Sequence, residues 1–199
     1  VVGQDHLLNE GEPIRRMIDA GQLASLALWG RHGCGKTTMV RLIADAVDLA
    51  FEPLSAVFSR IAYLRKVFAR AQERRSSGQC TLLFVDEIHR FNRAQQDGFL
   101  PYVEDGTVIL IGATTENPSF VLHAALLSRC QVLVLNRLDT NALEQLAVRA
   151  QSLMGRQLPL DDEARQSLIA MANGDGRYLF NMCEVLVAPE WEEPPSTAN

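Results

Sequence analysis

Residues 28–39 read LWGRHGCGKTTM and place a glycine-rich turn between a short apolar run and a stretch with helical periodicity. The spacing G-x-x-x-x-G-K-[ST] is typical of a loop that binds phosphate groups. Glycines there adopt backbone angles that other residues disfavour, so successive N–H groups can point at one anion, and the next helix N-terminus adds partial positive charge. The sequence therefore predicts a nucleotide-phosphate site lined by Gly30, Gly33, Cys34, Gly35, Lys36, Thr37 and Thr38.

Two side chains of this turn carry groups suited to a triphosphate. The Lys36 ammonium can reach the β- and γ-phosphates, and the Thr37 hydroxyl can hold Mg²⁺. The Cys34 thiol lies near positive charge, so it is either unusually acidic or a small residue that fits the turn. The alternative for the whole stretch is a tight strand-to-helix turn with a surface lysine. A chance match to the spacing in a chain of this length is rare, about 1%.

A second apolar run, residues 81–86, ends in the adjacent acids Asp86 and Glu87. Beside a phosphate-binding loop, the first acid would help to hold the Mg²⁺ shell. The second could orient and polarise a water molecule that attacks the γ-phosphate. A solvated turn is the alternative for such a pair. The sequence favours hydrolysis by water over phosphoryl transfer to a metabolite, for which we identify no acceptor pocket.

Polar side chains also follow the apolar run at residues 108–114. A hydroxyl or amide from Thr115 or Asn117 could hold the attacking water or the γ-phosphate, and a hydrogen-bonded turn is the alternative for the threonine. Arg129 stands between a helical stretch and the next apolar run. Taken alone, it reads as one surface arginine among many.

Short apolar strands alternate with helical stretches over the first two thirds of the chain. Continuous apolar strands interleaved with helices predict an α/β fold, a buried and mostly parallel sheet with helices on both faces. Ligands of such sheets bind at the carboxyl ends of the strands, where Gly30, Asp86 and Thr114 fall. The five expected strands are 26–29, 51–55, 81–86, 108–114 and 132–135, and the expected helices are 37–47, 60–75 and one from about residue 93.

The pattern changes after Asn136, where three helical stretches follow without a strand between them. We expect N-terminal caps at Asn141 (in a box with Glu144), at Asp161 and at Asp175. The predicted domains are an α/β nucleotide-binding domain over residues 1–136, a small all-helical domain over 137–188, and an acidic, proline-rich tail or linker over 189–199.

Composition is ordinary for a water-soluble globular protein, with 199 residues, 47% hydrophobic residues and a net charge of −5. No apolar run reaches the length of a membrane span, and we expect no membrane partner. The four cysteines form no C-x-x-C pair, so neither a zinc site nor a disulfide framework is expected, which fits a reducing cytoplasm. The first residue is not Met, which is expected of an excised fragment.

Positive charge is concentrated in residues 60–75, which carry six Arg or Lys residues against one Glu. Their apolar positions recur at helical spacing. We interpret the segment as a core-packed amphipathic helix with a solvated basic face. The alternative is a surface that contacts the phosphate backbone of a nucleic acid.

Together these motifs resemble the AAA+ ATPase superfamily and, within it, the family of replication-associated recombination protein A (RarA, also MgsA) and its eukaryotic relative, the Werner-helicase-interacting ATPase. The resemblance covers about residues 1–187 and departs from the usual family pattern at Arg31, His32 and Cys34. It is carried by the stretches VVGQDHLL, GRHGCGKTT, FEPLSAV, FVDEIHRFNRAQQDGFLPYVEDG, IGATTENPSF, ALLSRC and GDGRYLFN.

The resemblance implies a P-loop fold of AAA+ type and a role for each matching position. Lys36 and Thr37 would be the Walker A residues, and Asp86 and Glu87 the Walker B pair. Thr115 falls at sensor 1, with Asn117 as a nearby alternative.

Further positions receive roles from the resemblance alone. Arg129 would be an arginine finger supplied to the nucleotide of a neighbouring subunit. Arg177 would be sensor 2, on a helical lid. Val2, Gly3 and Gln4 would belong to the box that lines the adenine, and Ser55 would restrain the Walker B glutamate until DNA binds.

For function, the resemblance implies a DNA-dependent ATPase of replication-fork maintenance, recombination and repair that uses ATP and Mg²⁺. It implies a homo-oligomer, a tetramer in the full-length protein, in the cytoplasm at the nucleoid. The expected partners are junctions of single-stranded and duplex DNA, stalled forks and single-strand-binding protein. Alternatives are a clamp-loader motor, a Holliday-junction branch-migration motor and an ATP-gated scaffold with little turnover. Bacterial clamp-loader motors carry a four-cysteine zinc module that these cysteines do not supply.

Overall fold

The computed structural model describes residues 1–57 and 61–188. The residue contacts divide the chain into two compact units. The first comprises Val1 and Gly3–Arg137, and the second comprises Val2 and the residues from Leu138 onward. The expected tail, residues 189–199, lies outside the described residues. Within the described ranges, no helix is long and apolar enough to cross a membrane.

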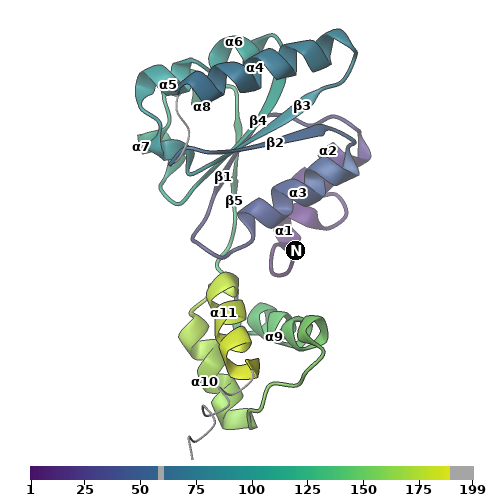
Figure 1. Ribbon diagram of the computed structural model, residues 1–199, viewed down its shortest axis with the longest axis vertical. Helices are drawn as coiled ribbons and strands as arrows, with labels where there is room; N and C mark the ends of the chain where they lie inside the picture. The colour runs from purple at the N-terminus through teal and green to yellow at the C-terminus, as the bar shows by residue number, and fades with distance from the viewer. Residues whose placement is uncertain (58–60, 189–199) are drawn as a thin grey trace, which may run out of the picture. The chain divides into compact units, whose positions relative to one another are not determined.

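The first unit is built on a five-stranded sheet in which each pair of neighbouring strands is parallel (Figure 1). The strand order is β2-β3-β4-β1-β5. This arrangement confirms the α/β sheet expected from the alternating pattern. The strands are β1 (Leu26–Trp29), β2 (Ala50–Ser55), β3 (Thr81–Asp86), β4 (Val108–Thr114) and β5 (Gln131–Val134).

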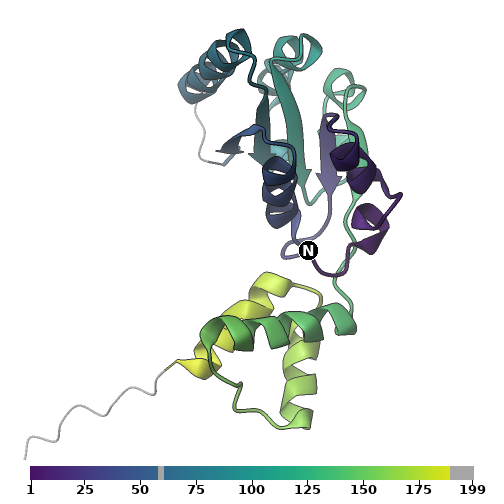
Figure 2. The same ribbon diagram turned by 90° about the vertical axis from the view of Figure 1, so that its right-hand side faces the viewer.

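Helices cover both faces of this sheet, as Figures 1 and 2 show. Within β3, Leu83 and Val85 belong to one apolar core and Leu82 and Phe84 to the other, so the whole strand is apolar. One face packs against α1 (Asp5–Leu8), α2 (Pro13–Asp19) and α3 (Lys36–Ala46). The other packs against α4 (Ile61–Ser76), the 3-10 helix η1 (Ile88–Arg90), α6 (Leu100–Glu104), α7 (Pro118–Val121) and α8 (Ala124–Leu127), and α5 (Arg93–Asp97) contacts α8.

The single helix expected from about residue 93 is two short helices, α5 and α6. Asn92 begins the first with a capping box, in which its side chain accepts from the Gln95 N–H and the Gln95 side chain accepts in return. The first helix ends at Asp97, before Gly98, and the second carries Pro101 in its first turn. Proline lacks the N–H that a longer helix would use, so the segment breaks here.

The basic helix α4 is held to the sheet by ion pairs. The buried Glu52, on edge strand β2, accepts from Arg70 Nη2 at 2.5 Å and from Arg74 Nη1 at 3.1 Å. Arg75 pairs with Asp105 at 3.3 Å. Three of the basic side chains of α4 are therefore paired within the described part of the chain, which favours the interpretation as a core-packed helix over a nucleic-acid surface.

The second unit consists of three helices, α9 (Thr140–Met154), α10 (Asp162–Ala172) and α11 (Gly176–Val187). Asp161 and Asp175 cap the second and third helices, as expected from the sequence. The expected cap at Asn141 is wrong, because Asp139 accepts from the Ala142 N–H at 2.7 Å and the helix begins one residue earlier. Glu144, expected in that cap, instead pairs with Arg165 of α10 at 2.5 Å.

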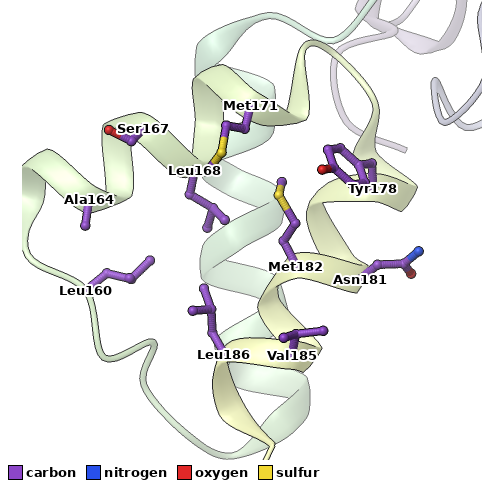
Figure 3. A pocket seen from close by; sticks show the side chains of 10 residues that line it. All are labelled: Leu160, Ala164, Ser167, Leu168, Met171, Tyr178, Asn181, Met182, Val185 and Leu186. Atoms are coloured by element: carbon purple, nitrogen blue, oxygen red, sulfur yellow. The ribbon is translucent and has the colours of Figure 1, made fainter.

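An apolar groove of about 620 Å³ lies between α10 and α11 (Figure 3). Met171 of α10 and Met182 and Tyr178 of α11 are among the side chains that line it. Met171 is more than half exposed and Tyr178 is half exposed, so this part of the helical unit presents an apolar surface.

Candidate functional site

The predicted site residues of the first unit gather at the carboxyl edge of its sheet. The strand order places β3, β4 and β1 side by side, and they end in Asp86, Thr114 and Trp29. The Gly30 N–H donates to the Thr114 carbonyl at 3.1 Å, which ties the start of the phosphate loop to the end of β4. The site is therefore built on rigid strands rather than on a free loop.

The loop backbone has the conformation that the glycine pattern predicts. Gly33 and Gly35 have positive φ angles of 69° and 97°. A Cβ on Gly30 would lie 2.9 Å from the Leu135 Cβ, so only glycine fits this close approach. Gly35 caps α3 without a side chain, which leaves the first N–H groups of that helix available to an anion.

Lys36 is 7% exposed, and its ammonium lies inside the loop. Its Nζ donates to the Gly30 carbonyl at 2.6 Å and to the Arg31 carbonyl at 2.8 Å. A buried ammonium next to unpaired helix amides is suited to a phosphate group, so these residues fit the triphosphate of ATP.

Cys34 occupies the interior of the same loop. Its side chain is buried, and Sγ donates to the Arg31 carbonyl at 3.0 Å. A Cβ on Gly30 would lie 3.0 Å from Sγ, so the sulfur fills the space beside that glycine. These contacts favour the interpretation of Cys34 as a small residue that fits the turn.

Thr37 and Asp86 offer the oxygen ligands that Mg²⁺ prefers, a hydroxyl and a carboxylate. Both residues are half-buried, and they lie at the start of α3 and the end of β3. Asp86 Oδ1 accepts from the Glu87 N–H at 3.1 Å, which fixes the orientation of the carboxylate. This donor pair fits a Mg²⁺ ion next to the phosphates.

Glu87 has a left-handed backbone, with φ 54° and ψ 45°. This conformation costs a residue other than glycine about 1–3 kcal/mol, so the surrounding contacts must hold it. The turn is closed by the Arg90 N–H, which donates to the Glu87 carbonyl at 2.9 Å. Ile88 packs directly on β4, since a Cβ on Gly112 would lie 2.7 Å from the Ile88 Cδ1. The strained turn directs the acid away from the run of β3.

Two imidazoles flank the Glu87 carboxylate, which is 20% exposed. His89 Nδ1 lies 3.3 Å from Glu87 Oε2, and His32 Nδ1 lies 3.9 Å from Oε1. Sequence reasoning missed both histidines as neighbours of the acid. The D-E-x-H spacing was the available signal for His89, and the departure from the family pattern was the signal for His32.

The structure of the segment after β4 distinguishes between Thr115 and Asn117, the two candidates for sensor 1. Asn117 Oδ1 accepts from the Ser119 N–H at 3.0 Å and caps α7, so this oxygen has a structural partner. Thr115 is half-buried, and it stands between the buried Thr114 and the exposed Glu116. The geometry thus favours Thr115 over Asn117 as a group available to substrate.

Arg129 lies at the amino ends of the parallel strands, whereas the phosphate loop lies at their carboxyl ends. It precedes Gln131, which pairs with Leu26 at the start of β1, whereas Trp29 at the end of β1 leads into the phosphate loop. Three residues of a strand span about 10 Å. The chain therefore places Arg129 at the opposite edge of the sheet from its own phosphate loop.

The Arg129 guanidinium is 38% exposed and held from its own side. It pairs with Glu104 of α6, and Nη1 donates to the Ala125 carbonyl at 2.7 Å and to Ser128 Oγ at 3.1 Å. Burial raises the pKa of the neighbouring Cys130 thiol to about 11, so this thiol stays neutral and packs beside the core.

Gln4 completes the stretch Val2-Gly3-Gln4, which the resemblance assigns to the adenine. Its buried side chain donates through Nε2 to the Asn136 carbonyl at 2.8 Å and to the Cys34 carbonyl at 3.3 Å. Its Oε1 accepts from the Asn136 N–H at 2.9 Å. Gln4 thus fastens the segment that contains Gly3 to the phosphate loop and to the end of β5.

Replacing Gln4 with Ala should weaken ATP binding about tenfold, because two buried carbonyls and one N–H lose their partner and the segment loosens. Titration calorimetry with an ATP analogue measures this effect. Gln72→Ala, at an exposed position on α4, is the control and should bind as the wild type does. An unchanged affinity for the Gln4 variant would show that the segment does not support the nucleotide.

Two predicted site residues belong to the helical unit and stay predictions. Val2 groups with that unit, whereas Gly3, with a φ angle of 71°, belongs to the first. Arg177 is exposed in the first turn of α11.

A parallel sheet with a phosphate loop after β1 and an acid pair after β3 defines a P-loop ATPase. Residues 26–138 match the family described as "ATPase family associated with various cellular activities (AAA)", and the chain belongs to this family.

Its relatives narrow the class and confirm the resemblance found in the motifs. Replication-associated recombination protein A of Escherichia coli (strain K12) is 46% identical over 190 residues, which cover 93% of this chain and 42% of that protein. The protein of the same name from Haemophilus influenzae is 47% identical and is covered to 43%. ATPase WRNIP1 of Dictyostelium discoideum is 42% identical over 96% of this chain and is covered to 22%. The chain spans less than half the length of these relatives.

Solved structures agree on the fold. A structure described as the Thermotoga maritima RuvB Holliday junction branch migration motor is similar with a TM-score of 0.73 and 25% identity. The similarity covers 92% of this chain and 61% of that chain.

Proposed function

We propose that this chain is the motor part of a DNA-dependent ATPase that maintains replication forks and acts in recombination and repair. The observation that carries the proposal is the buried Lys36 in a loop at the same sheet edge as Asp86 and Glu87. The name of the relatives supplies the cellular processes, replication and recombination, and in our proposal the protein acts on DNA in the cytoplasm, at the nucleoid.

In this proposal each residue of the site has one task. The loop amides and Lys36 bind and orient the phosphates, and Thr37 and Asp86 hold Mg²⁺, which neutralises charge on the phosphate oxygens. Glu87 orients a water molecule in line with the γ-phosphate and accepts its proton. Thr115 holds the water or a γ-phosphate oxygen.

A second subunit stabilises the negative charge that develops on the phosphate oxygens in the transition state. Arg129 begins at the sheet edge opposite its own loop, so in an assembly it serves the nucleotide of a neighbour. An arginine supplied in this way accelerates hydrolysis by ~10³–10⁵-fold. We therefore propose a homo-oligomer, a tetramer in the complete protein, that hydrolyses ATP at its subunit interfaces.

The helical unit acts as a lid in the same proposal. Arg177, at the start of α11, is its sensor 2 residue for the γ-phosphate, and Val2 and Gly3 line the adenine.

The proposal is tested by steady-state ATP hydrolysis with different DNA structures. The complete protein is assayed without DNA and with single strands, blunt duplex, gapped duplex and forked duplex. We expect junctions of single-stranded and duplex DNA to stimulate ATP hydrolysis strongly. Single-strand-binding protein on the gap should recruit more of the ATPase to the DNA and raise the rate further. Equal rates with and without every DNA would contradict DNA dependence.

The similarity to RuvB favours one second candidate, a branch-migration motor. That function requires stimulation by four-way junctions above forks and gapped duplexes, and the same assay distinguishes the two. Stimulation only in the presence of a sliding clamp would instead indicate a clamp loader.

A further inference from the structure

His89 lies between the ends of two neighbouring strands, and its side chain is 6% exposed. Its Nδ1 is 3.3 Å from Glu87 Oε2, after β3, and 3.0 Å from Thr114 Oγ1, at the end of β4. Its Nε2 is 3.4 Å from Glu116 Oε1. One nearly buried ring therefore connects the acid proposed as the base with the two residues on either side of Thr115.

The partners determine how this ring is used. The Thr114 hydroxyl is hydrogen-bonded to Nδ1, and the two carboxylates lie within ion-pair distance of the two ring nitrogens. Thr114 is itself fixed, because its hydroxyl accepts from the Glu116 N–H at 3.0 Å. His89 thus contacts Glu87 through Nδ1, and it contacts the residues on either side of Thr115 through both ring nitrogens.

The other polar neighbours of the acid are less well placed. His32 is 68% exposed and its Nδ1 lies 3.9 Å from Glu87 Oε1, beyond hydrogen-bond distance. Ser55 pairs in register with Asp86, one residue before the base. Among the described contacts, His89 is the nearer imidazole and the one that is shielded from water.

Packing also limits the movement of this ring. It belongs to η1, whose first residue, Ile88, lies against Gly112 of β4 with no room for a Cβ between them. The Phe91 N–H donates to the Ile88 carbonyl at 3.1 Å and closes the turn. The backbone of His89 is therefore held against the strand that carries Thr114.

We propose that His89 is a positioning residue that holds the Glu87 carboxylate in register with the Thr115 segment. Through His89, a displacement of the Thr115 segment, which is proposed to contact the γ-phosphate, moves the Glu87 carboxylate, and a displacement of Glu87 moves that segment. This inference rests on the proposed function, in which Glu87 activates water.

The test compares three substitutions of His89 and one control substitution in the complete protein. His89→Ala should lower kcat about 10- to 100-fold with little change in KM for ATP, because the phosphate loop is untouched and the base is misplaced. His89→Asn keeps an N–H donor near the Nδ1 position and should recover part of kcat, whereas His89→Gln places its donor toward Glu116 and should recover less. His123→Ala removes a different imidazole–carboxylate pair, with Asp97, and should retain kcat.

A double variant separates positioning from general damage. In the Glu87→Gln background, where the base is absent, adding His89→Ala should lower single-turnover hydrolysis no further. A further drop equal to the one seen in the wild-type background would overturn the inference. So would an Asn variant as impaired as the Ala variant, or a loss that follows a lowered Tm.

The same series distinguishes the inference from the function beneath it. Hydrolysis that requires Glu87 but is indifferent to His89 overturns the inference alone. A wild-type protein without hydrolysis, or one that Glu87→Gln leaves fully active, overturns the proposed function and the inference with it.

Discussion

Replacing Glu87 with Gln should lower ATP hydrolysis by at least about 100-fold and leave ATP binding nearly unchanged. The amide keeps the volume of the side chain but accepts no proton from water. The Lys36 amine and the helix amides that bind the phosphates are not altered. The measurement is a single-turnover assay combined with retention of ATP on the protein.

The control for this variant is Glu73→Gln, an exposed position on α4 that makes the same change in charge away from the sheet edge. It should hydrolyse ATP as the wild type does. If Glu87→Gln turns over at the wild-type rate, another group activates the water and the role given to this acid is wrong. If the wild type also retains ATP without hydrolysis, the chain is a nucleotide-gated scaffold.

Replacing Arg129 with Ala should reduce ATP hydrolysis of the assembled protein by ~10³-fold or more, with little effect on ATP binding. The side chain begins at the edge of the sheet opposite its own phosphate loop, so its loss removes positive charge from the neighbour's transition state. Steady-state hydrolysis at a concentration at which the oligomer is intact, verified by light scattering, measures the effect.

Mixing two inactive proteins tests whether the arginine acts across an interface. Subunits with Lys36→Ala lack a working loop but retain Arg129, and subunits with Arg129→Ala are the reverse. Their mixture should recover part of the activity, since some interfaces combine an intact loop with an intact arginine. Arg75→Ala, which breaks a comparable surface ion pair with Asp105, is the control and should remain active. Full activity of the assembled Arg129→Ala protein would show that Arg129 is not an arginine finger.

The sequence was sufficient for the sheet and the phosphate loop because both depend on local rules. Apolar strands that are buried on both faces read as continuous runs, and positive φ angles require glycine at Gly33 and Gly35. Acids directly after a buried strand must emerge at its carboxyl end, which located Asp86 and Glu87.

Contacts between distant segments were not predictable in this way. Asp139 and Asn141 are both good caps, and which one begins α9 depends on how the chain leaves β5. Gln4 reaches Asn136 across more than 130 positions, and His89 reaches Glu116 only because β3 and β4 are neighbours. Spacing within one segment carries no information about such partners.

The basic helix α4 shows the same limit for charge. The six basic residues among residues 60–75 left a nucleic-acid surface open as the alternative to a solvated helix face. Only the fold shows that Arg70 and Arg74 both meet the buried Glu52 of edge strand β2. A run of like charges therefore identified a helix face but not its partner.

The central claim is that the loop after β1 grips a nucleoside triphosphate, and calorimetric titration of this chain with a non-hydrolysable ATP analogue and Mg²⁺ tests it most directly. We predict one binding event per chain, abolished by Lys36→Ala in a protein whose circular dichroism is unchanged. A correctly folded wild-type chain that releases no binding heat and is not protected against thermal unfolding by the analogue would contradict the account.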